Sequence, residues 1–395
     1  MKKLLTIFIF SLLLLSGKPM LAQEIALREA GVAFPQMKKF YGDMQRRVLD
    51  LPEISGYYLI KADLHMHTVY SDGYVWPVTR VEEAFMEGID AIAITDHIEF
   101  SPLKKYLPCD DYNLPYEIAK PRADELGIIL IRGAEVTREV PAGHFNAIFI
   151  EDANKLAKLV NKENPSDQSS IKETLQEVVN QGGFVFFNHP WYKQPGDRAN
   201  WHPVHEELYQ QGLIHGVEVN NRDRYYPNIF QWCLDKGLAM MSNTDAHNPL
   251  FRLEPGAHRS MNILLAKECS QKGIREALDN KRTVVYTQNY LYGKEEHVMP
   301  IFEHAVVQKI IHQTEKGFIV ELKNIAGIPF HIQIEDANGL KVQQTNFILA
   351  EHGNAALIFR SDAQVMGQSF KVSAKVLNCH TGPEKPLNFV FNLKL

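Results

Sequence analysis

Short apolar runs alternate with amphipathic stretches between about residues 57 and 290. A short apolar run bounded by turn residues is typical of a buried strand, whereas apolar positions three and four residues apart indicate a helix that packs one face against a sheet. The strands predicted in this way are Tyr58–Leu64, Ala91–Thr95, Ile128–Gly133, Phe145–Ile150, Phe184–Asn188, Val217–Asn220, Leu238–Ser242 and Met261–Leu265.

Amphipathic helices are predicted between these strands, and several end before a glycine, the residue that most readily closes a helix in the left-handed conformation. Alternating strands and helices predict an α/β domain over residues 57–294 with parallel strands inside and helices outside. Roughly seven or eight such units favour a closed or nearly closed barrel over a doubly wound sheet. The predicted helices are Val78–Glu87, Tyr116–Leu126, Ser170–Gln181, Pro203–Gln211, Pro227–Lys236 and Gln271–Asn280.

The pattern changes after about residue 295, where helical periodicity nearly disappears. Short β-type runs separated by Gly, Asn, Asp and Pro predict a small C-terminal β-sandwich over residues 295–395. This region has no clustered metal-ligand residues, so we expect an accessory or packing role for it. The runs are Ala305–Gln313, Gly317–Lys323, Phe330–Glu335, Ala355–Phe359, Phe370–Val376 and Asn388–Leu393.

The N-terminus has the layout of a secretory signal peptide over residues 1–22: Lys2 and Lys3, an apolar run from Leu4 to Leu15, and a less apolar stretch that ends at Ala22. The alternative is an uncleaved N-terminal anchor, although the apolar run is too short to span a bilayer comfortably. We therefore expect export to a periplasm or the cell exterior, with no stable membrane span after cleavage. Residues 23–56 are predicted to form a helical extension that packs on the barrel.

The composition of the chain bears on which partners the protein can bind. The chain has 395 residues, of which 45% are hydrophobic and 23% charged, and a net charge of −5, which describes an ordinary globular protein without the basic surplus of a nucleic-acid binder. Nucleic acid is therefore an unlikely partner. The four cysteines, Cys109, Cys233, Cys269 and Cys379, have no Cys-x-x-Cys spacing, so neither a zinc knuckle nor a redox pair is indicated. The oligomeric state cannot be predicted.

Metal-ligand residues follow the predicted strands. Because residues i and i+2 of a strand point the same way, His65 and His67 can present two imidazoles to one cation, and so can Asp245 and His247. Imidazole and carboxylate suit divalent zinc, manganese or iron. Repetition at several strand ends predicts a polynuclear site. The clusters are Asp63-Leu64-His65-Met66-His67, Thr95-Asp96-His97, Gly133-Ala134-Glu135, Asn188-His189-Pro190 and Asn243-Thr244-Asp245-Ala246-His247.

The order of these motifs resembles the PHP superfamily, named for polymerase and histidinol phosphatase, over residues 57 to about 290. The resemblance implies a distorted (β/α)7 TIM-like barrel that holds two or three divalent metal ions (Zn, Mn or Fe) through nine ligands, and leaves the C-terminal sandwich outside. The positions that match the family's ligands are His65, His67, Asp72, His97, Glu135, His144, His189, Asp245 and His247.

The resemblance also implies how the ligands are shared. A first metal would take His65, His67, Glu135 and Asp245, a second would take Glu135, His144 and His189, and a third would take Asp72, His97 and His247. Glu135 is expected to bridge, because a carboxylate has two oxygens. Two positions keep an alternative: a hydrogen-bonded His144 without metal, since it precedes its strand, and Asp72 as a turn residue of Ser-Asp-Gly. Asp96 is expected to orient its neighbours rather than bind metal.

The chemistry implied is phosphate ester hydrolysis, of a monoester or small diester, by a metal-bridging hydroxide in a trinuclear site. Glu135 and Asp245 are the candidate catalytic residues, and Asp245 or one of the metal-site histidines would assist proton transfer to the leaving alkoxide. A small phosphorylated substrate would need cationic side chains, and an aromatic wall is available in Trp191, Tyr192, Trp201, Tyr225 and Tyr226. The candidate cations on the same side of the barrel are Arg138, Lys193, Arg222, Arg224 and Arg259.

Three alternatives remain open. An exonuclease or nucleotide phosphodiesterase would use the same metals but would need a basic groove, which the acidic composition does not indicate. An amide or ester hydrolase is chemically possible and would be indifferent to inhibition by phosphate. A non-catalytic binding protein with structural metals is the third, and failure to turn over any substrate with every metal would favour it.

Overall fold

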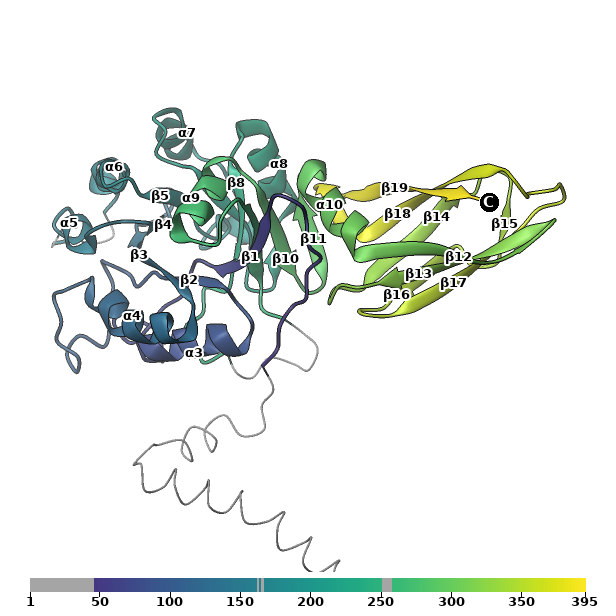
Figure 1. Cartoon of the computed structure of the whole chain (residues 1–395). Coiled ribbons are helices and arrows are strands. Elements are labelled where there is room, and N and C mark those ends of the chain that lie inside the picture. Colours follow the sequence, from purple (N-terminus) through teal and green to yellow (C-terminus); the bar gives the residue numbers. More distant parts are fainter. Residues whose placement is uncertain (1–45, 162, 165–166, 251–257) are drawn as a thin grey trace, which may run out of the picture. The chain divides into compact units, whose positions relative to one another are not determined.

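The computed structural model describes residues 46–161, 163–164, 167–250 and 258–395, with strands grouped into two domains (Figure 1). The predicted signal peptide and residues 23–45 of the predicted helical extension lie outside the described residues. Residues 46–56, which are described, contain no helix and run as extended and turn segments, with an isolated bridge between Ile54 and Tyr57. For this part the helical prediction is wrong.

The first domain contains a mixed, strongly curved sheet. Strands β1, β2 and β3 pair in parallel, as do β5, β6 and β8, whereas β4 runs antiparallel to both β3 and β5, and β9 runs antiparallel to β1. The strands are β1 (Tyr58–Asp63), β2 (Ala91–Ile94), β3 (Ile129–Thr137), β4 (His144–Ile148), β5 (Phe184–Phe187), β6 (Gly216–Asn221), β7 (Arg224–Tyr225), β8 (Ala239–Asn243), β9 (Met261–Ala266), β10 (Thr283–Thr287) and β11 (Tyr290–Gly293).

Every predicted strand of this domain is present. The prediction that all of these strands are parallel is wrong, because β4 and β9 run antiparallel to their neighbours. The connection from β3 to β4 spans only residues 138–143, which is too short for the crossover that a parallel pair requires. The curved sheet meets itself through side chains: Asn262 of β9 accepts a hydrogen bond from the Ser242 amide of β8 and donates one to the Ser242 carbonyl, both at 2.8 Å. Predicted α/β character is confirmed, with a mixed rather than parallel strand order.

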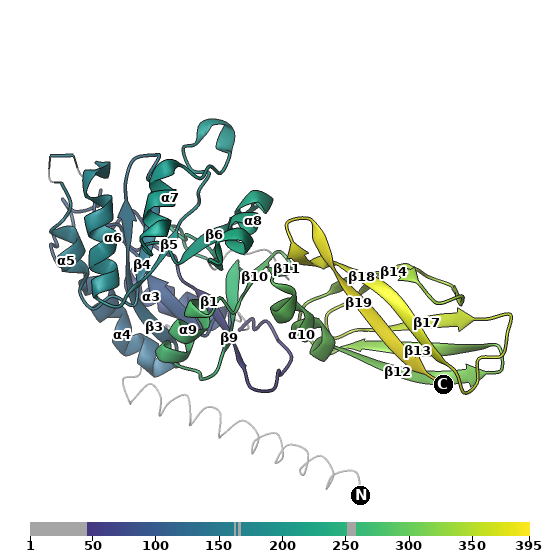
Figure 2. The same ribbon diagram turned by 90° about the horizontal axis from the view of Figure 1, so that it is seen from above.

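Helices surround this curved sheet (Figure 2). Helix α9 shows why they form: the Ser270 hydroxyl caps its first turn by accepting from the Gly273 amide, and Ile274, Ala277 and Leu278 form its buried face. The helices are α3 (Pro77–Met86), α4 (Leu114–Leu126), α5 (Ala153–Ala157), α6 (Ile171–Asn180), α7 (Pro203–Gln210), α8 (Pro227–Lys236) and α9 (Gln271–Asp279), with 3-10 turns at Gln168–Ser170 and Pro195–Asp197.

The C-terminal domain is a two-sheet sandwich, as predicted. One sheet has the order β12-β13-β17-β15 and the other pairs β16, β14, β18 and β19. Helix α10 (Glu295–Ala305) precedes it and was not predicted, because Pro300 interrupts its pattern. The strands are β12 (Val306–Thr314), β13 (Gly317–Asn324), β14 (Phe330–Asp336), β15 (Lys341–Val342), β16 (Asn346–Leu349), β17 (Asn354–Arg360), β18 (Ser369–Gly382) and β19 (Lys385–Lys394).

Strand β11 joins the two domains into one sheet. It pairs antiparallel with β10 on one side and parallel with β18 on the other, where Leu291 lies opposite Cys379 and Tyr292 opposite His380. The buried side chains of Phe302 in α10 and Phe330 in β14 pack edge-to-face at 5.0 Å between ring centroids. One sheet of the sandwich is therefore hydrogen-bonded to the sheet of the first domain through the pairing of β11 with β18.

Candidate metal centre

All nine predicted ligands gather at one edge of the curved sheet. His65 and His67 follow β1, His97 follows β2, His189 follows β5, and Asp245 and His247 follow β8. Glu135 lies within β3, and Asp72 in the loop before α3. His144 comes first in β4, yet it joins the others because β4 runs antiparallel, with Thr137 of β3 opposite His144. The reversed strand explains why a residue before its strand faces the same edge as residues after theirs.

Glu135 is the centre of the cluster. Its Oε2 lies 3.3 Å from His65 Nε2 and 3.1 Å from His67 Nε2, and its Oε1 lies 3.0 Å from His144 Nδ1 and 3.6 Å from His189 Nε2. Oε2 also lies 3.2 Å from His97 Nδ1, so the two oxygens of one carboxylate face two different sets of imidazoles. This is the placement that a bridging carboxylate requires.

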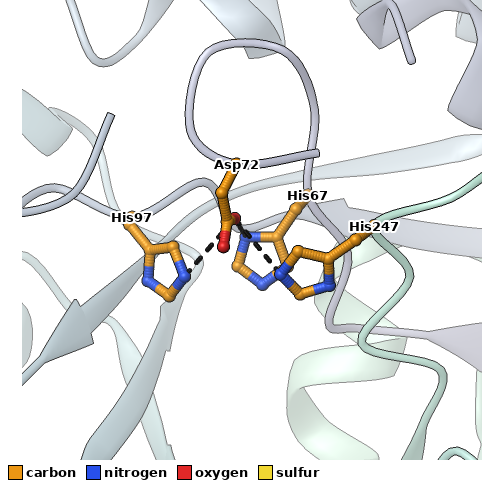
Figure 3. Close-up of side chains that lie close together, drawn as sticks. All are labelled: His67, Asp72, His97 and His247. Atoms are coloured by element: carbon orange, nitrogen blue, oxygen red, sulfur yellow. Dashed lines mark ion pairs between the residues drawn. The ribbon is translucent and has the colours of Figure 1, made fainter. Parts of the chain in front are cut away.

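A second centre forms around Asp72 (Figure 3). Its Oδ1 lies 3.2 Å from His247 Nε2, 3.5 Å from His97 Nε2 and 3.7 Å from His67 Nδ1. The same oxygen is buried and has no hydrogen bond. A buried carboxylate oxygen that faces three imidazoles without a hydrogen bond is suited to a cation.

Four overlapping groups of ligand atoms result, each with its atoms within 4.8 Å of one another. The group of Glu135, His144 and His189 is the one expected for the second metal. The group around Asp72 contains the residues expected for the third metal and also His67. The residues expected for the first metal divide into two groups, which are His65 with His67 and Glu135, and His65 with His189 and Asp245. His67 and His189 each belong to two groups, whereas the resemblance assigned each of them to one metal.

Opposite charges hold the cluster together. Burial alone would raise the pKa of Glu135, but the imidazoles of His97, His65, His144 and His189 lower it well below its usual value. Burial opposes protonation of His67, but hydrogen bonds to Asp245 and Glu135 outweigh it and raise the pKa of His67 to about 9. Carboxylates that stabilise a proton on a neighbouring imidazole also favour a divalent cation, which competes with that proton.

Glu218, in β6, supports the candidate ligands and was not predicted from the sequence. Its buried carboxylate accepts from His65 Nδ1 at 2.9 Å, from the His189 amide at 2.8 Å, and from the side-chain amides of Asn221 and Asn243 at 2.9 Å each. It thus orients two candidate ligands without facing the pocket. The available signal was a glutamate between the two valines of a predicted buried strand, Val217 and Val219, since such a charge is rarely buried without partners.

Arg80 and Asp96 support the two loops that carry ligands. Arg80, fully buried, donates from Nε to the His67 carbonyl at 2.9 Å and from Nη2 to the Ala246 carbonyl at 2.7 Å. Asp96 accepts from the Thr68 amide and hydroxyl and from the Ser71 hydroxyl, each at 2.6 Å. Asp96 therefore orients its neighbours, as predicted, whereas Arg80 was not singled out.

The backbone at the site is held in an unusual conformation. His189, Arg222 and Asp245 have φ values of 25°, 56° and 49°, in a region that residues with a Cβ rarely adopt. Such conformations persist only where surrounding contacts fix them, and they are concentrated at functional sites.

A pocket of about 490 Å³ opens above the ligand cluster. His65 and His67 lie below it, fully buried, while charged and aromatic side chains form its walls. It is lined by Asp72, His97, Glu135, His144, His189, Trp191, Tyr192, Asn221, Arg222, Asp223, Arg224, Asp245 and His247.

Only two of the five predicted substrate-binding cations line this pocket. Arg222 and Arg224 do, with 56% and 54% of their side chains exposed, and Nη2 of Arg222 lies 3.2 Å from Asp245 Oδ2 and 3.2 Å from His247 Nδ1. The third, Lys193, is exposed and lies over the Tyr192 ring at 5.1 Å from its centroid, outside the lining.

The predictions for Arg138 and Arg259 are wrong. Arg138 is buried in an ion pair with Glu99 and donates to the Thr174 hydroxyl at 3.2 Å. Arg259 is buried with its Nη1 3.3 Å from Asp63 Oδ2. A guanidinium enclosed in the interior with a carboxylate partner is not available to a substrate, so these two arginines have structural roles.

The aromatic residues also divide. Trp191 and Tyr192 line the pocket, whereas Tyr226 stacks on the far side of Trp191 at 4.4 Å between ring centroids. Trp201 packs against His205 and Trp232, and Tyr225 stacks on Tyr292. Of the five aromatic residues predicted to form a wall, Trp191 and Tyr192 line the pocket.

Comparison with known proteins assigns the family. A model described as PHP domain matches residues 63–215, and a model of an Ig-like domain matches residues 306–392. Two uncharacterized proteins of Methanocaldococcus jannaschii are 28% and 26% identical over 198 and 186 residues, which cover 48% and 41% of this chain and 83% and 90% of those proteins.

One similar crystal structure covers both domains. It is that of a two-domain protein from Bacteroides vulgatus said to contain a predicted PHP-like metal-dependent phosphoesterase, which is 36% identical, with a TM-score of 0.82 over 89% of this chain and 100% of that one. Identity at this level across a whole relative, together with the matched domain model, places this chain in the PHP-like metal-dependent phosphoesterase family, with an Ig-like C-terminal domain.

Proposed function

We propose that this protein hydrolyses small phosphate esters at a site that holds two or three divalent ions. The observation that carries the proposal is the placement of Glu135, whose two carboxylate oxygens face different sets of imidazoles at the floor of a pocket lined by two arginines. Divalent ions bound there would lower the pKa of a water molecule and neutralise charge on a phosphoryl group. Zinc, manganese and iron all suit this donor set.

The remaining roles belong to residues of the chain. Arg222 would bind a phosphate oxygen, because its guanidinium is exposed to the pocket and lies beside Asp245 and His247 at the mouth of the ligand cluster. Asp245, at the edge of both the cluster and the pocket, is the candidate to accept the proton of the attacking water and to pass it to the leaving oxygen. Tyr192 would flank the leaving group.

Pocket size supports a small substrate. A cavity of about 490 Å³ accommodates a phosphorylated small molecule, and its walls combine Arg222 and Arg224 with Asp223 rather than forming a continuous basic groove. This arrangement favours a phosphomonoester or compact diester over a nucleic-acid strand, which needs a basic track for its backbone.

The test pairs metal content with turnover. Elemental analysis of the purified protein should find two to three divalent ions per chain, and an aryl phosphate monoester or diester should be hydrolysed. Glu135→Gln should lower the metal content and abolish hydrolysis. Glu117→Gln, at a surface ion pair with Arg132, is the matched control and should retain both properties. Full metal loading without turnover of either ester would contradict the proposal.

A further inference from the structure

One short segment connects the pocket to the Ig-like domain. Residues 222–226 leave β6, form β7 and enter α8, and their arginines line the pocket. From the same segment, the Tyr225 hydroxyl donates a hydrogen bond to the Pro383 carbonyl at 2.9 Å. Pro383 lies in the turn between β18 and β19, which Figures 1 and 2 both place beside β11 and α8.

The contact around Tyr225 is extensive. Its ring stacks on Tyr292 of β11, with 4.0 Å between ring centroids and 20° between planes. Tyr292 in turn packs on His380 of β18 at 5.1 Å, directly across the parallel ladder that joins the two domains. Tyr225 is thus held by a hydrogen bond to the Ig-like domain and by a ring that this domain's longest strand supports.

Tyr226, the next residue, connects this segment to the pocket through its contact with Trp191. Successive side chains of an extended segment point to opposite sides. Tyr225 therefore faces the Ig-like domain, while Tyr226 stacks on the pocket-lining Trp191 with 13° between planes. The Tyr226 amide donates to the Val219 carbonyl at 3.1 Å, which fixes the end of the segment on β6.

Arg222 needs such support. Its side chain is 56% exposed, and the contacts of its Nη2 with Asp245 and His247 can form only where the backbone directs the side chain toward them. That backbone has φ of 56°, and it is held by a hydrogen bond from its amide to the Asn243 carbonyl at 2.9 Å and by the Ser260 hydroxyl, which donates to its carbonyl. An arginine in the left-handed conformation is sensitive to loss of the contacts that fix its backbone.

We propose that the β18–β19 turn of the Ig-like domain holds Tyr225 and thereby positions Arg222 for binding a substrate phosphate. Tyr225 is then a positioning residue, and the Ig-like domain is part of what shapes the substrate pocket. The inference rests on the proposed function for the role of Arg222 but not for the bracing of the segment, which can be measured separately.

The first test measures the bracing alone, in the full-length protein. Tyr225→Phe removes one hydroxyl and keeps the ring stack. Loss of one such hydrogen bond should speed amide hydrogen exchange of residues 222–226 roughly threefold to tenfold. Tyr209→Phe is the matched control, because the Tyr209 hydroxyl donates to the Lys236 carbonyl at 2.8 Å within the first domain. This control should leave exchange in residues 222–226 unchanged. Equal exchange in Tyr225→Phe and wild type would overturn the proposal.

The second test measures binding. Inorganic phosphate should bind the metal-loaded Tyr225→Phe variant several-fold more weakly than wild type, and KM for a phosphate ester should rise by a similar factor with kcat changed less. Metal content should stay at the wild-type value. Faster exchange with unchanged phosphate affinity would overturn the link to Arg222. Absence of turnover in wild type would count against the proposed function alone, since the exchange result does not depend on it.

Discussion

Glu218 Oε1 lies 2.9 Å from Nδ1 of His65, and both side chains are fully buried. An ionised carboxylate only accepts, so Nδ1 of His65 carries the proton and Nε2 is the nitrogen directed toward the ligand cluster. Nε2 is within 3.3 Å of both Glu135 Oε2 and Asp245 Oδ1. One carboxylate outside the cluster thus sets which nitrogen of His65 is directed toward Glu135 and Asp245 and would face a metal.

Substitution Glu218→Gln should weaken metal binding. All four partners of Glu218 are donors, and a glutamine amide would bring a further NH2 group among them. We expect a loss of about 10- to 100-fold in metal affinity, as for other partners of metal-ligating histidines. Competition with a chelator of known affinity measures it. Glu82→Gln, at an ion pair with Arg122, serves as control. Wild-type affinity in Glu218→Gln would rule out the orienting role.

Substitution Gly73→Ala should displace Asp72 and remove one metal. A Cβ at Gly73 would lie 2.6 Å from the His67 carbonyl carbon and 2.7 Å from the Thr68 nitrogen, and these backbone atoms cannot move aside without moving His67. The group around Asp72 should open, while Glu135, His144 and His189 stay in place. Elemental analysis should find about one ion fewer per chain, because the ligands of one metal would no longer lie close together. An unchanged metal count would mean that the loop adapts.

The ligand set could be predicted from the sequence because its spacing is local. His65-x-His67 and Asp245-x-His247 each lie at a strand end, and the period of a strand alone places both members on one side. The direction of β4 is not local information, because it depends on pairing with β3 and β5, and His144 was therefore the least predictable ligand. Glu218 was not predicted because three of its four partners, His65, His189 and Asn243, come from other segments of the chain.

Burial of cations could not be predicted either. The local sequence around an arginine that follows a strand is the same whether its side chain faces a pocket or the protein interior. Arg138 and Glu99 lie 39 residues apart in sequence, and Arg259 and Asp63 lie 196 apart, so neither pair forms a recognisable motif. Only tertiary packing separates these structural arginines from Arg222.

Arg222 and Arg138 should therefore respond differently to substitution. Arg222→Ala should lower kcat/KM by roughly 10- to 100-fold through weaker substrate binding, since hydrogen bonds to charged groups are the stronger kind. Arg138→Met leaves the Glu99 carboxyl buried without its partner and should destabilise the fold by about 3–5 kcal/mol. Kinetics with an aryl phosphate and chemical unfolding distinguish the two effects. A selective rise in KM for Arg138→Met would restore it as a substrate ligand.

His205 should make stability fall in mild acid. It is buried in α7, donates from Nε2 to the Ala142 carbonyl at 3.0 Å and accepts at Nδ1 from the His202 amide at 3.0 Å, and the accepting contact needs the neutral ring. Burial lowers its pKa to about 4, against 6.5 in an unfolded chain. The folded state binds fewer protons between these values, so its contribution to stability is complete above pH 6.5 and declines as pH falls toward 4.

Comparison of wild type with His205→Gln isolates this contribution, because glutamine keeps a donor and an acceptor but does not titrate. Between pH 7 and pH 5, wild type should lose about 2 kcal/mol more free energy of unfolding than the variant, since one pKa unit corresponds to about 1.4 kcal/mol. Groups other than His205 titrate in both proteins and cancel in the difference. Urea unfolding at the two pH values measures it. Parallel losses in the two proteins would show that the His205 ring accepts a proton in the folded state.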